Sequence, residues 1–236
     1  MLAIALLTVC CPKASAADLR LLIVTGGHDF EREAFFAMFD SFQGMTHREV
    51  QHPAANDQYA SEAAAEYDVL VLYDLNQTIT EEQKAALLAM LERGKGLVVL
   101  HHALADYQDW DEWREVIGGR YFLAPIEREG KQIPASTYRH GVDIPVHVAD
   151  PDHPVTKGLS DFTIHDEVYG GYEVLASVHP LLTTNHPESS PTLAWTNTYG
   201  NSRVVTIQLG HDRVAWENPN YRTLVYQAIR WGARQP

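Results

Sequence analysis

Short runs of apolar residues constrain the fold more than any other feature of this 236-residue chain. They occupy residues 19–25 (LRLLIVT), 68–73 (DVLVLY), 96–100 (GLVVL) and 203–209 (RVVTIQL), and polar or glycine-containing sequence follows each of them. Runs of this kind are typical of strands buried on both faces, which occur in parallel sheets covered by helices. The sequence therefore predicts an α/β fold with a mostly parallel central sheet.

Helical patterns separate these runs. We expect helices at about residues 31–42, 81–93 and 220–233. Thr80 and Gln83 have the spacing of a capping box, which predicts that the second of these helices begins after Thr80. Strands that alternate with helices indicate βαβ units, so the runs should lie side by side in one sheet.

Residues 121–165 interrupt this alternation. They contain five prolines and a short alternating stretch at 144–148 (IPVHV), and we interpret them as an inserted loop and hairpin, not as a second domain. Residues 174–184 and 192–197 have the composition of further short strands. The length of the chain suits one large domain, for which we expect residues 17–236.

The N-terminus has the features of an export signal. Residues 2–11 are apolar, and the small residues 14–16 (ASA) predict cleavage after Ala16, which would place the mature protein in the periplasm or outside the cell. A lipid anchor on Cys10 or Cys11 is the alternative, although neither follows the small residue that such an anchor requires. No window is long and apolar enough to predict a membrane span.

The composition limits which reactions and which partners the protein can have. Cys10 and Cys11 are the only cysteines, so a chain that begins at residue 17 has no thiol and no disulfide. The formal net charge of −13 disfavours phosphate backbones, so we do not expect a nucleic-acid partner. A neutral or cationic ligand fits better than a polyanion. The pair 26–27 (GG) lacks the pattern of a nucleotide-binding loop.

Polar residues follow the predicted strands at the points where ligands bind in open α/β sheets. The histidines in these positions, together with an acidic residue further along the chain, are our candidate catalytic residues: His28, His101, His102, His211 and Glu167. Neighbouring residues are candidates for substrate binding: Asp29, Asp74, Asp166, Tyr169, Asp212 and Trp216. Since the ends of parallel strands share one edge, we expect the histidines to meet in one cleft.

Three uses of these residues are open at this point. They could act as acids and bases without a metal, because imidazole titrates near neutral pH. They could hold a divalent cation such as zinc, although the compact spacing of familiar zinc motifs is absent. Each histidine could also be an ordinary buried residue.

The chain resembles the ThuA-like (trehalose-utilisation) family. The resemblance rests on segments that cover nearly all of residues 24–233 in order: VTGGHDF, VVLHHA, WREVIGGRY, DPDHPVTKGL, DEVY, LLTTNHPES, TLAWTNTYGNSRVVTIQLGHD and AWENPNYRTLVYQAIRWGA. It implies a flavodoxin-like three-layer fold similar to that of class I glutamine amidotransferases. By this resemblance His211 matches the triad histidine, and residues 101–103 match the turn that presents the catalytic cysteine. Because a thioester needs a thiolate, we expect no glutaminase activity.

The resemblance also implies a role in sugar breakdown. A 3-oxo-disaccharide or other 3-oxo-glycoside is the substrate class it suggests, because the ketone acidifies the neighbouring C–H and allows elimination or hydrolysis by acid–base or metal-assisted chemistry. The alternatives are a carbohydrate-binding protein without catalysis and a metal-dependent hydrolase of another substrate. Assembly into a homo-oligomer is open.

Overall fold

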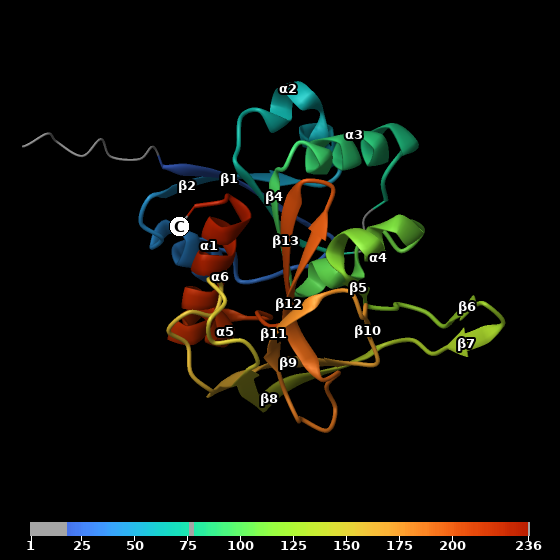
Figure 1. Ribbon diagram of the computed structural model, residues 1–236, viewed down its shortest axis with the longest axis vertical. Coiled ribbons are helices and arrows are strands. Elements are labelled where there is room, and N and C mark those ends of the chain that lie inside the picture. Colours follow the sequence, from blue (N-terminus) through green and yellow to red (C-terminus); the bar gives the residue numbers. More distant parts are fainter. Residues whose placement is uncertain (1–17, 76–77, 236) are drawn as a thin grey trace, which may run out of the picture.

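The computed structural model describes residues 18–75 and 78–235. These residues form a nine-stranded sheet with the order β2-β1-β3-β4-β13-β12-β11-β8-β9 (Figure 1). Its first five strands are parallel: β2 (Met45–Gln51), β1 (Leu19–Gly26), β3 (Val69–Asp74), β4 (Gly96–Leu100) and β13 (Ser202–Ile207). This is the strand order of flavodoxin-like sheets, which confirms the predicted fold class.

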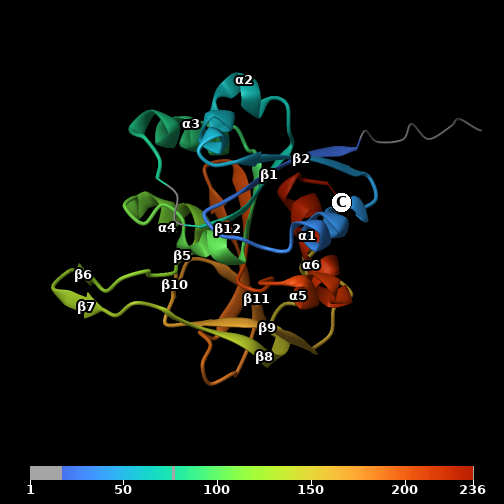
Figure 2. The same ribbon diagram turned by 180° about the vertical axis from the view of Figure 1, so that it is seen from behind.

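Helices cover both faces of the parallel strands, and alternate side chains of one strand show why. Leu21 and Ile23 of β1 pack into one apolar core, and Leu22 and Val24 pack into the other. The first core is closed by α1 (Arg32–Asp40), α5 (Arg213–Glu217) and α6 (Pro219–Gly232). The second is closed by η1 (Ala54–Tyr59), α2 (Ser61–Ala64), α3 (Glu81–Glu92), η2 (His101–Ala105) and α4 (Asp111–Ile117). Figures 1 and 2 show these two helical layers on opposite sides of the sheet.

The beginning of α3 follows the predicted local chemistry. The Thr80 hydroxyl accepts a hydrogen bond from the Gln83 N–H at 3.3 Å, and the Gln83 side chain accepts one from the Thr80 N–H at 3.1 Å. The capping box predicted from the sequence is therefore confirmed.

The region after residue 120 contributes more to the sheet than expected. A long antiparallel pair, β8 (Thr137–Val148) and β9 (Phe162–Gly170), continues the sheet through β11 (His179–Thr183) and β12 (Thr192–Tyr199). Our interpretation of residues 121–165 as a loop and hairpin was therefore incomplete. β8 contains Pro145, which is tolerated because β8 pairs with β11 only at His147 and Val148.

Smaller elements complete the described chain. One two-stranded sheet pairs β5 (Gly119–Arg120) with β10 (Glu173–Val174), and another is the hairpin of β6 (Ile126–Arg128) and β7 (Lys131–Ile133). The expected strand at 174–184 is thus divided between β10 and β11. The predicted export signal at residues 1–16 lies outside the described residues. Among the described helices, none has the length and apolar character of a membrane span.

Candidate functional site

The turn after β4 forms the floor of the site. His101 follows the last residue of β4 and has a φ of +45°, a left-handed conformation that residues other than glycine rarely adopt. Its Nδ1 hydrogen-bonds to the main-chain carbonyl of Gln208, which comes just after β13. Because a carbonyl can only accept, this nitrogen carries the proton, and the neutral ring then has its lone pair on Nε2.

Glu167 of β9 meets the Nε2 atom of His101 in the interior. Its Oε2 lies 2.8 Å from His101 Nε2 and 2.9 Å from His211 Nδ1, and these two nitrogens are 3.1 Å apart. His140 of β8 approaches the other carboxylate oxygen, with its Nδ1 at 3.3 Å from Oε1. The Tyr169 hydroxyl lies 2.9 Å from His101 Nε2. One buried carboxylate therefore contacts three imidazoles that come from different parts of the chain.

Burial and charge shift the protonation of this cluster. Burial raises the pKa of Glu167, but hydrogen bonds from His101 and His211 outweigh it and lower the pKa to about 2. Burial lowers the pKa of His211, but its hydrogen bond to Glu167 and the charge of that carboxylate raise it above the usual value. Burial lowers the pKa values of His28 and His102, and neighbouring imidazoles lower them further. At neutral pH, Glu167 is ionised and His28 and His102 are neutral.

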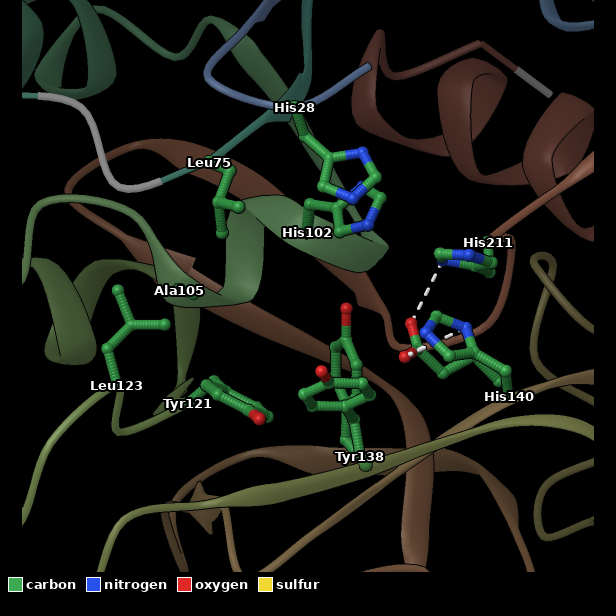
Figure 3. Close-up of a pocket in the computed structure, with 11 residues that line it drawn as sticks. His28, Leu75, His102, Ala105, Tyr121, Leu123, Tyr138, His140 and His211 are labelled. Atoms are coloured by element: carbon green, nitrogen blue, oxygen red, sulfur yellow. Dashed lines mark ion pairs between the residues drawn. The ribbon is translucent and has the colours of Figure 1, made fainter. Parts of the chain in front are cut away.

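A cavity of about 240 Å³ opens above this cluster. Imidazoles and Glu167 line one part of it, and tyrosines and aliphatic side chains line the rest (Figure 3). The residues that surround it are His28, Leu75, His102, Ala105, Tyr121, Leu123, Tyr138, His140, Glu167, Tyr169 and His211. Titratable groups that meet apolar surface in one small cavity are typical of a ligand-binding or active site.

The predicted histidines do meet in one place. The ring centroid of His28 lies 4.0 Å from that of His102 and 6.0 Å from that of His211. The centroid of His101 lies 4.4 Å from that of His102. Glu167 approaches from β9, as expected for the acidic residue of the inserted region. The catalytic roles of these residues stay a prediction, but their common location is a feature of the structure.

Asp166 supports the site from behind. Its side chain is buried and accepts hydrogen bonds from the backbone N–H groups of Glu167 at 2.8 Å, Gly210 at 2.7 Å and His211 at 2.9 Å. The carboxylate thereby ties β9 to the segment that carries His211. These contacts indicate that Asp166 positions the backbone of the site, whereas we expected it from the sequence to bind substrate.

The other proposed substrate-binding residues differ in location. Tyr169 lines the cavity, but Asp212 caps α5 and the buried Trp216 donates its ring N–H to a main-chain carbonyl. Asp74 is fully buried and lies 2.6 Å from His52 Nε2. Asp29 lines a neighbouring depression that shares His28 with the cavity. Of the proposed substrate-binding residues in this paragraph, only Tyr169 lines the cavity, and the cavity wall does not include Asp29, Asp74, Asp212 or Trp216.

Of the six cavity-lining residues that sequence reasoning missed, three have aromatic or imidazole rings. His140 and Tyr138 come from β8, and Tyr121 follows β5. The side chain of His140 is 57% exposed, so it faces the cavity and not the core. A usable signal was the alternation in residues 137–148, which is longer than the stretch we recognised. Tyr121 gave no comparable signal.

Four of the clustered residues have the arrangement of metal ligands. His101, His102, Glu167 and His211 each offer one donor atom, and all four atoms lie within 4.8 Å of one another. Imidazole and carboxylate donors suit zinc and its neighbours among the first-row metals. A metal held here would border the cavity.

The comparisons with known proteins identify the family of the chain. The family model for ThuA, described as trehalose utilisation, matches residues 20–232. The chain belongs to the ThuA family. Membership links the protein to trehalose utilisation and carbohydrate metabolism. The predicted family resemblance is thus confirmed over nearly the whole of the described chain.

Solved structures support the same fold. A putative ThuA-like protein from Parabacteroides merdae has a TM-score of 0.74 and 19% identity, over 92% of this chain and 90% of that one. Another from Bacteroides uniformis has a TM-score of 0.71 and 20% identity, over 94% of each chain. A GH42 beta-galactosidase from G. stearothermophilus has a TM-score of 0.56 and 14% identity, over 94% of this chain but 31% of that one. No curated protein matches the chain.

Proposed function

We propose that this ThuA-family protein is an enzyme that acts on oxidised sugars, namely 3-oxo-glycosides, by elimination or hydrolysis. The observation that carries the proposal is the buried Glu167 shared by His101, His140 and His211 beneath a small cavity. This carboxylate contacts three titratable rings around a space that a ligand can enter.

The reaction divides into two proton transfers. A neutral imidazole at the cavity takes the proton from C2 of the sugar, next to the C3 ketone, and His28 is suited to this because partial desolvation and the neighbouring imidazoles lower its pKa. The electron pair moves onto the ketone oxygen and gives an enediolate, which His211 can stabilise as an imidazolium because Glu167 raises its pKa. When the pair returns, the C1–O bond breaks and a double bond forms between C1 and C2.

The leaving alcohol then needs a proton. His140 lies at the exposed side of the cavity and contacts Glu167, so it can deliver a proton to the glycosidic oxygen as that bond breaks. Addition of water across the new double bond, with hydroxide on C1 and a proton on C2, completes hydrolysis. No step requires a thiol, which this chain lacks beyond residue 11.

The shape of the cavity supports a sugar as the ligand. A volume of about 240 Å³ is at the small end of ligand pockets, which suits one sugar ring and not a large cofactor. Tyr121 and Tyr138 offer aromatic faces, and aromatic rings pack against the apolar faces of sugars while their hydroxyl groups bind polar atoms.

The test is turnover of 4-nitrophenyl 3-oxo-β-glucoside, followed by release of nitrophenol, with 4-nitrophenyl glucoside as the unoxidised control. We expect turnover of the oxidised compound only. His28→Ala and His140→Ala should each lower kcat by about 100-fold or more, the usual loss for a positioned acid or base. His165→Ala is the matched control, because His165 pairs with Asp143 on the exposed surface. Binding of the oxidised sugar without turnover would instead support the carbohydrate-binding alternative.

We also propose that the protein is exported. The apolar residues 2–11 and the small residues before Ala17 support this proposal. N-terminal sequencing of the protein from a cell fractionation should give a first residue near Ala17 in the periplasmic or extracellular fraction. An intact N-terminus in the cytoplasmic fraction would contradict it.

A further inference from the structure

We propose that His101, His102, Glu167 and His211 form a binding site for one divalent transition-metal ion at the floor of the cavity. The evidence for binding is independent of the sugar reaction, whereas the use of the metal in catalysis rests on the function proposed above. Four donor atoms, three nitrogens and one oxygen, converge within 4.8 Å of one another.

The contacts among three of these atoms cannot all be hydrogen bonds. His101 Nε2, His211 Nδ1 and Glu167 Oε2 form a triangle with sides of 2.8, 2.9 and 3.1 Å. A ring nitrogen has a single in-plane direction, along which it either donates or accepts. Two nitrogens therefore cannot satisfy three sides of the triangle. A cation near its centre removes the conflict, because each atom then directs a lone pair at the metal.

The size of the triangle fits a metal. Ligand bonds of about 2.0–2.2 Å at angles between 90° and 109° place neighbouring donor atoms about 3 Å apart. The observed separations of 2.8–3.1 Å agree with this spacing. The hydrogen bond from His101 Nδ1 to the carbonyl of Gln208 provides the support that metal-binding histidines commonly have, because it fixes the tautomer with a free Nε2.

His102 provides a second and independent observation. Only 4% of the residue is exposed, and its Nδ1 is buried without a hydrogen-bond partner in the described part of the chain. Burial of an unsatisfied polar atom is unfavourable, so such an atom in a cluster of ligand-type residues indicates a missing partner. Figure 3 shows the His102 ring at the cavity beside His28.

The donor set selects the class of metal. Three imidazoles and one carboxylate suit Zn²⁺, Co²⁺, Ni²⁺ or Mn²⁺, whereas Mg²⁺ and Ca²⁺ prefer a shell of oxygen atoms. Four protein ligands leave up to two positions in a six-coordinate ion, on the side of the cavity. A 3-oxo-sugar has a ketone oxygen at C3 and a hydroxyl at C2, and this pair can occupy two neighbouring positions.

Such binding would aid the proposed reaction directly. A metal held by His101, His102, Glu167 and His211 would supply Lewis-acid stabilisation of the charge that develops on the C3 oxygen when the C2 proton passes to an imidazole outside the ligand set. No electron is exchanged with the metal, so a redox-inactive ion is sufficient. His28 and His140 are outside the ligand set and remain available for proton transfer.

The experiment measures binding first. Full-length protein is stripped with a chelator, and ZnCl₂, MnCl₂ and MgCl₂ are titrated in separate calorimetry runs, with metal analysis of the dialysed product. We expect one equivalent of zinc or manganese and no comparable binding of magnesium. His211→Ala and Glu167→Gln should each weaken binding by about 100-fold or more, because even loss of an outer partner costs 10–100-fold. His165→Ala should bind as the unmodified protein does.

The outcomes separate this inference from the proposed function. Absence of zinc and manganese binding, or equal binding by His211→Ala in protein whose circular dichroism is unchanged, would overturn the metal site. Full turnover of the 3-oxo-glucoside by stripped protein would overturn its use in catalysis. One bound equivalent of metal that depends on His211 and Glu167, without any turnover, would leave the metal site standing and contradict only the proposed function.

Discussion

Replacing Asp166 by asparagine should destabilise the protein through the backbone of the site. One oxygen of Asp166 accepts the N–H groups of Glu167 and His211, and the other accepts that of Gly210. Asparagine can keep the first oxygen but must direct its NH₂ group at the Gly210 N–H. The lost charged hydrogen bond contributes about 1.5–3 kcal/mol, and the two remaining bonds weaken because the acceptor is neutral. We expect the free energy of unfolding to fall by about 3 kcal/mol.

The assay is urea denaturation followed by fluorescence, with a thermal melt as a second measurement. For a domain of this size, about 3 kcal/mol corresponds to a decrease in Tm of roughly 6–12 °C. Asp161→Asn is the matched control, because Asp161 also accepts a backbone N–H, from Val148 at 2.8 Å, but its side chain is 64% exposed. The control should shift the urea midpoint and the Tm far less than Asp166→Asn does, because water screens its contacts. Equal losses in the two variants would refute the reasoning from burial.

Two further predictions concern charge and packing at the site. In metal-free protein, NMR titration should give His211 a pKa above its usual value, and Glu167→Gln should lower it, since burial then acts without the carboxylate. The stabilisation that comes from a raised pKa in the folded state is fully present below the unfolded pKa and is lost as the pH rises through the folded pKa. Glu167→Gln should therefore reduce the free energy of unfolding more at pH 6 than at pH 9. An equal loss at both pH values would contradict this. Gly210→Ala should cost about 3 kcal/mol in urea denaturation, because a Cβ would lie 2.0 Å from the Tyr221 hydroxyl oxygen at a φ of +111°. Gly44→Ala, with a φ of +73° and open space, should cost only about 1 kcal/mol, and similar losses would show that the steric contact is unimportant.

The sequence was sufficient to predict four of the five parallel strands and the meeting point of the histidines. Strands buried on both faces leave an apolar signature, and the first polar residues after such strands must lie along one edge of the sheet. His28, His101 and His211 were identified in this way, although they are up to 183 positions apart in the chain (211 − 28). That inference used only the position of each histidine after a predicted strand, and not the spacing between the histidines along the chain.

The antiparallel half was harder to predict because its strands are exposed on one side. β8 has a mostly exposed first half, so the residues 137–143 carry no apolar run, and His140 was missed with them. β2 was missed for a similar reason, because it is an edge strand with the half-buried sequence MTHREVQ. His52 follows β2 and pairs with Asp74, and it was not recognised because β2 was not predicted. Periodicity identifies buried strands, whereas exposed strands are fixed by pairing that only the folded chain shows.

The turn after β4 shows how one fold can present different chemistry at the same position. By the resemblance to class I glutamine amidotransferases, residues 101–103 match the turn that presents the catalytic cysteine. Here His101 has a left-handed backbone, but its ring is fully buried and both ring nitrogens are engaged, Nδ1 by the Gln208 carbonyl and Nε2 by Glu167. A nitrogen held in this way cannot attack a substrate carbon. The strained turn instead directs the imidazole inward against Glu167 beneath the cavity, and in the reaction proposed above proton transfer at the ligand falls to the more exposed rings of His28 and His140.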